Sequence, residues 1–414
     1  LAVATVIFFM WGFLTSLNDV LVPHLKAVFS LNYSHVMLVQ FTFFGAYFVM
    51  SLPSGKVVSR WGYKQSIVIG LVVAGLGALL FYPAAALPSF GLFLAAFFTL
   101  ATGITLLQVA ANPYVALLGP ARTASSRLNL AQALNSLGTT LAPKFGGMII
   151  LSVAVLGAAD LARLPAAAQI AYRARQAALV QGPYLGLAVV LFALAAGVYL
   201  FHLPALASAA HGHGGADAEL SFLDALRHRH LRLGVIGIFV YVGAEVSIGS
   251  FLINYISLPD IGHMAESRAA TFVSLYWGGA MIGRFAGAAV LQRFDPRRLL
   301  GGAAGVAALL VATTMTTAGF VAVWSIVAIG LFNSIMFPNI FTLGIERMGP
   351  LTGKASSLLI MAIVGGAVVP LLQGALADRI GVQHAFVLPL ACYLYIIYYG
   401  FRGSRIEEPV LIHA

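Results

Sequence analysis

Two carboxylates lie inside long apolar stretches of this sequence, at Asp19 in SLNDVL and at Glu245 in YVGAEVSIGS. In a bilayer each ionised group would cost at least about 2.5–3.5 kcal/mol, so each needs a function or a partner. A buried carboxylate can take up a proton, ligate Na⁺ or accept hydrogen bonds from hydroxyl groups. A structural ion pair is the alternative for Asp19. We therefore predict that Asp19 and Glu245 are ion-coupling residues.

Uncharged amides form a larger polar set in similar stretches. Gln132 and Asn135 are three residues apart, and Gln108 and Asn112 are four apart, so each pair shares one face of a helix. An amide both donates and accepts hydrogen bonds, as a sugar hydroxyl does. The alternative for any one amide is an interhelical hydrogen bond worth about 0.6 kcal/mol. The candidate substrate-binding residues, with Trp277 as a ring that faces a sugar, are Asn18, Asp19, Gln40, Gln108, Asn112, Asn129, Gln132, Asn135, Asn254 and Trp277.

Basic residues and prolines complete the set of chemically notable positions. Lys56, Arg60 and Arg284 are candidate gating residues. The alternative for Lys56 and Arg60 is a surface loop without a gating role, and the alternative for Arg284 is a structural ion pair. Lys144 either neutralises an embedded carboxylate or extends its amine to the membrane surface. Pro113 and Pro338 interrupt two apolar stretches, where proline removes a backbone donor and promotes a kink.

The composition indicates what positions these residues. The chain has 414 residues, of which 60% are hydrophobic and 9% charged, whereas a soluble domain carries roughly 25% charged residues. We predict an all-α membrane protein with twelve transmembrane helices, because lipid requires the backbone to satisfy its own hydrogen bonds. The predicted segments are 1–24, 34–57, 66–83, 90–118, 127–154, 181–202, 231–256, 269–291, 298–318, 321–345, 353–376 and 384–401.

The segments divide into two groups of six. The longest polar break, 203–230, predicts a cytoplasmic linker between an N-terminal bundle, 1–202, and a C-terminal bundle, 231–414. The halves are weakly similar, since Ala-Ser-Ser occurs at the start of the fifth helix of each half, at Ala124 and at Ala355. Such repetition is expected of transporters built from two pseudo-symmetric six-helix bundles. Another break, 155–180, predicts a short amphipathic interfacial helix.

Charge placement predicts the orientation. With the N-terminus inside, sixteen of the 23 Lys and Arg residues lie in cytoplasmic connections or in the C-terminal tail. This excess favours a chain whose two termini are both cytoplasmic. The basic residues are scattered and form no patch for a nucleic acid, although the net charge is +10.

Several strings resemble a known family. Gly55–Lys64, GKVVSRWGYK, resembles the signature loop of the major facilitator superfamily, with Ser59 in place of the usual acidic residue. FFMWGFLTSLNDVLVPHLK at 8–26, LLQVAANPYVALLGP at 106–120 and SRLNLAQALNSLG at 126–138 resemble the fucose permease family, especially its glucose/galactose transporter branch. The resemblance implies a major facilitator fold and cation-coupled sugar uptake across a bacterial cytoplasmic membrane. Fucose permease has a carboxylate implicated in proton coupling where Gln108 stands, and glutamine does not titrate.

The sequence therefore predicts a multi-pass sodium- or proton-coupled symporter that imports a hexose such as glucose or galactose by alternating access. The alternatives are an uncoupled hexose uniporter, an importer of N-acetylhexosamine or fucose, an exporter, and a membrane sugar sensor. An enzyme is not predicted, because the sequence has no nucleophile–base motif, metal-binding spacing or phosphate loop. We expect a monomer without a cofactor, apart from Na⁺ as a co-transported ion.

Overall fold

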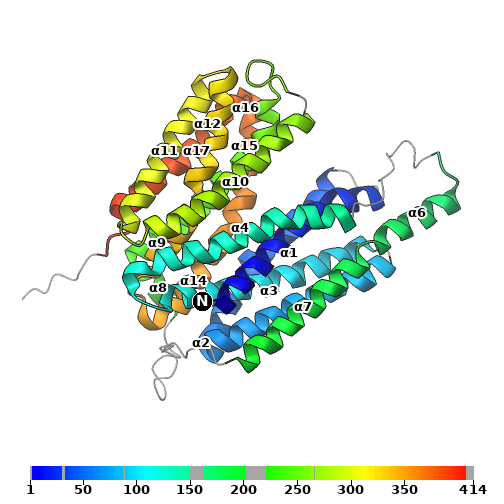
Figure 1. Cartoon of the computed structure of the whole chain (residues 1–414), viewed down its shortest axis with the longest axis horizontal. Helices are drawn as coiled ribbons and strands as arrows, with labels where there is room; N and C mark the ends of the chain where they lie inside the picture. The colour runs from blue at the N-terminus through cyan, green and yellow to red at the C-terminus, as the bar shows by residue number, and fades with distance from the viewer. Residues whose placement is uncertain are drawn as a thin grey trace, which may run out of the picture. The chain divides into compact units, whose positions relative to one another are not determined.

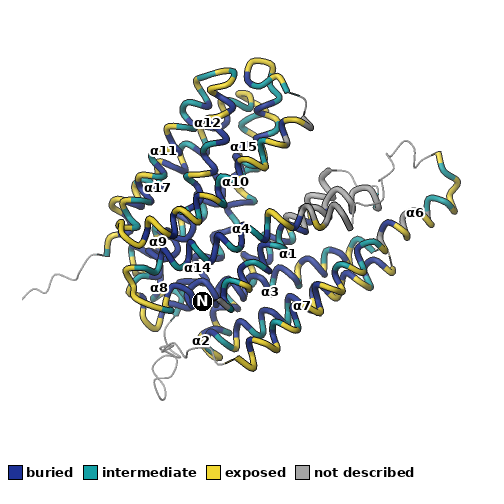
Figure 2. The backbone as a smooth tube through the Cα atoms, in the orientation of Figure 1, coloured by how far each residue is buried: buried dark blue, intermediate teal, exposed yellow. Residues whose placement is uncertain are grey.

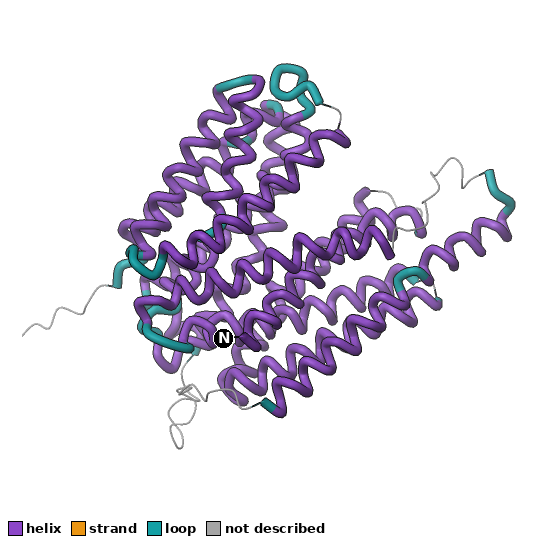
Figure 3. Tube along the Cα trace, in the orientation of Figure 1, coloured by secondary structure: helices purple, strands orange, loops and turns teal. Residues whose placement is uncertain are grey.

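The structure is a computed structural model that describes residues 2–29, 33–87, 89–149, 163–201, 221–264 and 266–406. All regular elements of the described part are helical (Figure 3). The principal helices (Figure 1) are α1 (Ala2–Val28), α2 (Tyr33–Ala86), α3 (Phe90–Leu117), α4 (Ala124–Ile149), α6 (Ala166–Ala178), α7 (Gln181–Leu200), α8 (Phe222–Arg227), α9 (Arg229–Ile256), α10 (Glu266–Val290), α11 (Pro296–Thr316), α12 (Gly319–Asn333), α13 (Met336–Gly344), α14 (Thr352–Met361), α15 (Gly365–Ile380), α16 (Val382–Ala385) and α17 (Val387–Tyr398). Short 3-10 turns lie at Ala121–Thr123, Gly349–Leu351 and Ala362–Val364, and a π-helical turn lies at Tyr399–Gly403.

Within the described residues, each of the twelve predicted apolar segments coincides with a helix or with consecutive helices; 150–154 of the fifth segment lie outside them. Eight helical stretches in the described part are long and apolar enough to cross a membrane. One of them, Phe41–Ala86 within α2, contains most of the second predicted segment and all of the third. The first, fifth and eighth segments correspond to α1, α4 and α10. The predicted all-helical membrane architecture is confirmed.

Gly62 separates the two membrane segments of α2. Its φ and ψ are 72° and 175°, a non-helical conformation inside an otherwise continuous helix. Side chains with a Cβ avoid this region, whereas glycine adopts it readily. No atom lies within 4 Å of the position that a Cβ would take, so the requirement for glycine comes from the backbone and not from crowding.

The chain forms two compact units. The first contains Leu1–Leu118 and Leu130–His211, and the second contains Gly119–Asn129 and Gly212–Ala414. The boundary at His211 falls inside the predicted linker, of which 203–220 lie outside the described residues. The start of α4 thus belongs to the second unit, and the rest of this helix to the first.

Each unit is organised around a buried helix. In the first unit α3 packs against α2, and its residues from Gly103 to Ala116 are all buried (Figure 2). In the second unit α9 packs against α10, α13, α15 and α17. The predicted interfacial helix at 155–180 corresponds to α6, and 155–162 lie outside the described residues.

The two predicted proline kinks differ in the structure. Pro113 lies within the uninterrupted helix α3. Near Pro338, by contrast, the predicted single segment 321–345 is divided into α12 and α13, with Ser334 and Ile335 between them. The polar groups around this second break form the candidate site.

Candidate functional site

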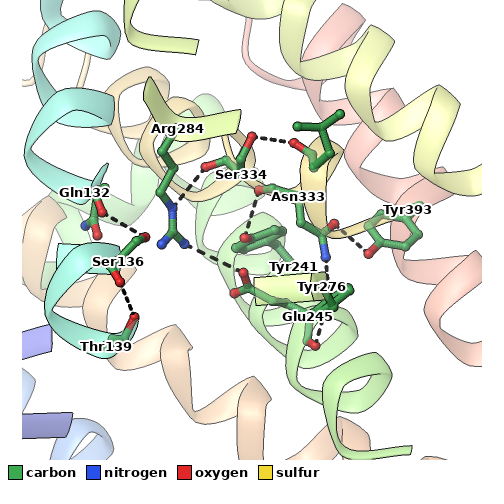
Figure 4. A network of polar contacts seen from close by, with 11 residues as sticks. Gln132, Ser136, Thr139, Tyr241, Glu245, Tyr276, Arg284, Asn333, Ser334 and Tyr393 are labelled. Atoms are coloured by element: carbon green, nitrogen blue, oxygen red, sulfur yellow. Dashed lines mark hydrogen bonds and ion pairs between the residues drawn. The ribbon is translucent and has the colours of Figure 1, made fainter. Parts of the chain in front are cut away.

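Glu245 and Arg284 form an ion pair inside the second unit. The Glu245 Oε1 atom of α9 lies 3.8 Å from an Nη atom of Arg284 on α10, and the two side chains are 11% and 12% exposed (Figure 4). Glu245 Oε1 has no hydrogen-bond partner among the described residues. A nearly buried carboxylate inside a membrane-length helix is costly unless a cation accompanies it, and here Arg284 is that cation.

A hydrogen-bonded network of tyrosines surrounds Asn333 at the end of α12. The Tyr393 hydroxyl donates to Asn333 Oδ1 at 2.7 Å, and Asn333 Nδ2 donates to the Tyr276 hydroxyl at 2.8 Å. The Tyr276 hydroxyl donates to the carbonyl of Glu245 at 3.3 Å, and the Tyr241 hydroxyl to the carbonyl of Asn333 at 3.0 Å. All five residues of the network are buried, so it connects α9, α10, α12 and α17 without exposed polar groups.

The candidate residues predicted from the sequence include none of Tyr241, Asn333 and Tyr393. A signal was available, because a tyrosine hydroxyl inside an apolar segment requires a hydrogen-bond partner. Asn333 was the amide that could supply one. Nothing in the local sequence, however, indicates that residues of four different segments meet at this point.

Gln108 and Tyr47 connect α3 to α2 in the first unit. Gln108 Nε2 donates to the Tyr47 hydroxyl at 2.8 Å, and both side chains are buried. Glutamine contributes a fixed donor here and cannot release a proton. Position 108 therefore carries a polar group in a fixed orientation, and this group does not titrate.

Asn135 lies where α1 and α4 meet in the first unit. Its Nδ2 donates to the carbonyl of Phe8 at 2.9 Å, and Ser16 donates to the carbonyl of Thr139 at 2.9 Å. A Cβ on Gly12 would lie only 2.3 Å from the carbonyl oxygen of Asn135. This close approach requires glycine at position 12 and gives Asn135 a structural contact, whereas its binding role stays a prediction.

Asn129 lies in the second unit, apart from the other candidate amides of its segment. Its Nδ2 donates to Ser125 O at 2.8 Å and to Asn339 Oδ1 of α13 at 3.3 Å. Ser125 and Thr342 share a hydrogen bond of 2.6 Å, and the Ser126 hydroxyl donates to the carbonyl of Ala288. These contacts hold the start of α4 against α10 and α13.

Asn112 and Gln132 complete the amides whose side chains are described. Asn112 is 0% exposed, and neither of its amide atoms has a hydrogen-bond partner among the described residues. Leaving a buried amide unpaired costs about 1–3 kcal/mol, and such groups are rare in folded proteins. Gln132 is buried one helical turn before Ser136, whose hydroxyl donates to the Gln132 carbonyl at 3.1 Å.

The remaining predicted residues are exposed or lie outside the described side chains. Trp277 is 39% exposed and packs edge-on against Tyr276, with ring centroids 5.2 Å apart. Arg60 places its guanidinium 5.8 Å from the ring centroid of Trp61, and Lys56 and Asn254 are exposed. The side chains of Asn18, Asp19, Gln40 and Lys144 lie outside the described residues.

Charged and amide groups buried inside membrane-length helices are typical of a membrane transporter. Residues 3–363 match the model of the Major Facilitator Superfamily. The chain therefore belongs to the major facilitator superfamily, and its predicted fold of two six-helix halves is confirmed.

Individual relatives refine this assignment. The chain is 50% identical to a glucose/galactose transporter of Brucella abortus over 97% of this chain and 93% of the relative. It is 42% identical to a putative glucose/galactose transporter of Helicobacter pylori, over 98% of this chain and 96% of that one. A crystal structure of the Escherichia coli fucose:proton symporter matches with a TM-score of 0.89 and 33% identity, over 96% of this chain and 97% of the other. The resemblance to the fucose permease family and its glucose/galactose branch is confirmed, and the chain is a multi-pass membrane transporter, not an enzyme.

Proposed function

We propose that this protein is a cation-coupled symporter that imports a hexose, with glucose and galactose as the first candidates. The substrate class is supported by the 50% and 42% identity to proteins named glucose/galactose transporters. Coupling is supported by the 33% identical structure of a symporter. The cation is Na⁺ or a proton.

The observation that carries the proposal is the Glu245–Arg284 pair. A carboxylate that is 11% exposed inside a membrane helix costs free energy unless a cation accompanies it. A transported cation can lower that cost in one part of the cycle, and Arg284 in another. Coupling requires that the cation and the sugar favour the same conformational state. Asp19, in α1, is the second candidate for the cation.

The hexose would be held by the amide set of the first half, with Asp19 as an acceptor. Asn112 is the amide best prepared to bind a hydroxyl group, because it is buried and its amide atoms have no partner within the described ranges of the chain. We place the sugar near the middle of the bilayer, where alternating access opens it first to one side and then to the other. The protein would act as a monomer in a bacterial inner membrane, with both termini cytoplasmic, without a cofactor or a nucleic acid.

Gln108 favours a second candidate function, an uncoupled hexose uniporter. Its amide donates to Tyr47 and cannot exchange a proton at this position. A uniporter would equilibrate glucose and would not accumulate it.

The test is uptake of radiolabelled glucose or galactose by proteoliposomes, with an inward Na⁺ gradient or an inward proton gradient imposed separately. We expect accumulation above equilibrium with one of the two gradients and its loss in Glu245→Gln. Glu346→Gln is the matched control, since Glu346 pairs with Arg297 in a different contact. Equilibration without accumulation under either gradient would favour the uniporter, and transport of neither sugar would contradict the proposed substrates.

A further inference from the structure

At the break between α12 and α13, Pro338 leaves one backbone carbonyl without its usual helical donor. In an α-helix the carbonyl of residue 334 accepts from the N–H of residue 338, and proline has no N–H. The Ser334 carbonyl instead accepts from Arg284 Nε, at 3.4 Å. A side chain of α10 thus replaces the missing helical donor.

The same guanidinium also faces the Glu245 carboxylate, 3.8 Å from its Oε1 atom. Arg284 therefore connects three helices, because Glu245 belongs to α9 and Ser334 follows α12 (Figure 4). Tyr241, four residues before Glu245, donates to the preceding carbonyl of the break, that of Asn333. The break is held by one charged donor and one neutral donor.

The position that Arg284 occupies has the features of a cation site. The C-terminal end of a helix such as α12 carries partial negative charge. In transporters with broken helices, the carbonyls at such an end coordinate the transported cation. Here Glu245 Oε1, which has no hydrogen-bond partner in the described part of the chain, and the carbonyl freed by proline both face Arg284.

We propose that Arg284 is a tethered cation that competes with the transported cation for Glu245. When the transported cation binds the Glu245 carboxylate, the Arg284 guanidinium moves away from that carboxylate. The hydrogen bond from Arg284 to the Ser334 carbonyl then changes. Cation binding is thereby transmitted to the α12–α13 break. This inference rests on the proposed function, because it needs a transported cation.

Competition predicts the direction of a mutational effect. Without Arg284 the carboxylate has no internal competitor, so the transported cation binds more tightly. A purely structural role predicts the opposite, since loss of the cap would loosen the site and weaken binding. Allosteric couplings are typically 5- to 150-fold, and we expect the half-saturating cation concentration to fall by about tenfold.

The experiment measures glucose exchange in proteoliposomes over a range of Na⁺ concentrations and, separately, of pH. Arg284→Gln should lower the half-saturating cation concentration, and Arg284→Lys, which keeps the charge, should restore most of the wild-type value. Arg293→Gln is the matched control, because Arg293 is exposed in the turn after α10. In the double variant Glu245→Gln/Arg284→Gln, which leaves no unpaired charge, exchange should no longer depend on the cation.

Two results would overturn the inference. One is an unchanged or raised half-saturating concentration in Arg284→Gln. The other is a cation dependence of exchange in the double variant that matches the wild type. If Arg284→Gln alone does not fold, the double variant tests the inference by itself. Wild-type exchange that responds to neither cation would instead reject the proposed coupling itself, and the competition with it.

Discussion

The hydroxyl oxygens of Ser125 and Thr342 lie 2.6 Å apart, although 217 positions separate them in the chain. Ser125 is in the first turn of α4, and Thr342 is near the end of α13. Both belong to the second compact unit, whereas α4 continues from Leu130 into the first. If the two bundles rock against each other during transport, the start of α4 must separate from α13 or bend near Asn129.

We therefore predict that a disulfide between Ser125→Cys and Thr342→Cys blocks transport. The hydroxyls are close enough for a 2.05 Å S–S bond to replace their contact. The background variant should carry Cys392→Ala, because Cys392 is a buried free thiol. Under oxidation sugar uptake should be lost, and a reductant should restore it.

Each single-cysteine variant, oxidised in the same way, is the control for that experiment. Uptake at the wild-type rate by a protein shown to be fully cross-linked would mean that this contact stays closed throughout the cycle. In that case any motion would have to occur by bending of α4 beyond Asn129.

The membrane architecture could be predicted from the sequence because it depends on local properties. Twenty apolar residues form a spanning helix wherever they occur, and each predicted segment corresponds to helix in the structure. The contact between Glu245 and Arg284 depends on the packing of α9 against α10, 39 positions apart, which no local pattern encodes. Both residues were predicted to be functional, but in separate roles.

The break in the tenth segment was only partly predictable. Pro338 indicated a kink, but Pro113 gave the same signal and lies in a continuous helix. The difference lies in tertiary donors, since Arg284 and Tyr241 satisfy the carbonyls at the α12 break. Asn129, likewise, shares a segment with Gln132 and Asn135, yet the structure places it against Asn339.

Gly62→Ala should destabilise the protein through the backbone alone. At φ 72° and ψ 175° a residue with a Cβ costs about 1–3 kcal/mol, and no neighbouring atom crowds the site. We expect a lower midpoint of thermal unfolding in detergent. Gly302→Ala is the control, because Gly302 also has open space in α11 but lies within a regular helix. Equal midpoints for the two variants would contradict the backbone explanation.

Acidification should destabilise α8. Asp224 accepts from the backbone N–H of Ser221 at 2.8 Å and from its hydroxyl at 2.9 Å, and these hydrogen bonds, with a smaller contribution from Arg227, lower the pKa of the Asp224 carboxyl. A lowered pKa means that the folded state prefers the ionised carboxyl. The stabilisation is present above the pKa of the unfolded carboxyl, about 4, and is lost as the pH falls through the lower, folded value.

Hydrogen exchange of the α8 amides over this acidic range would measure the effect. Exchange, corrected for its intrinsic pH dependence, should accelerate on acidification in the wild type. In Asp224→Asn it should be fast at neutral pH already and change little. If the two proteins show the same pH dependence, Asp224 is not the group responsible.

Asn112→Leu should separate stability from function. Both amide atoms of Asn112 are buried without a hydrogen-bond partner among the described residues. A leucine of similar shape removes a desolvation cost of about 1–3 kcal/mol, so the thermal midpoint should stay the same or rise while hexose uptake is lost. Asn333→Leu provides the contrast: both polar atoms of the Asn333 side chain are hydrogen-bonded, to Tyr276 and to Tyr393, so the loss of this amide should lower the midpoint. A clear fall in the midpoint of Asn112→Leu would show that the folded protein, and not a sugar, satisfies this amide.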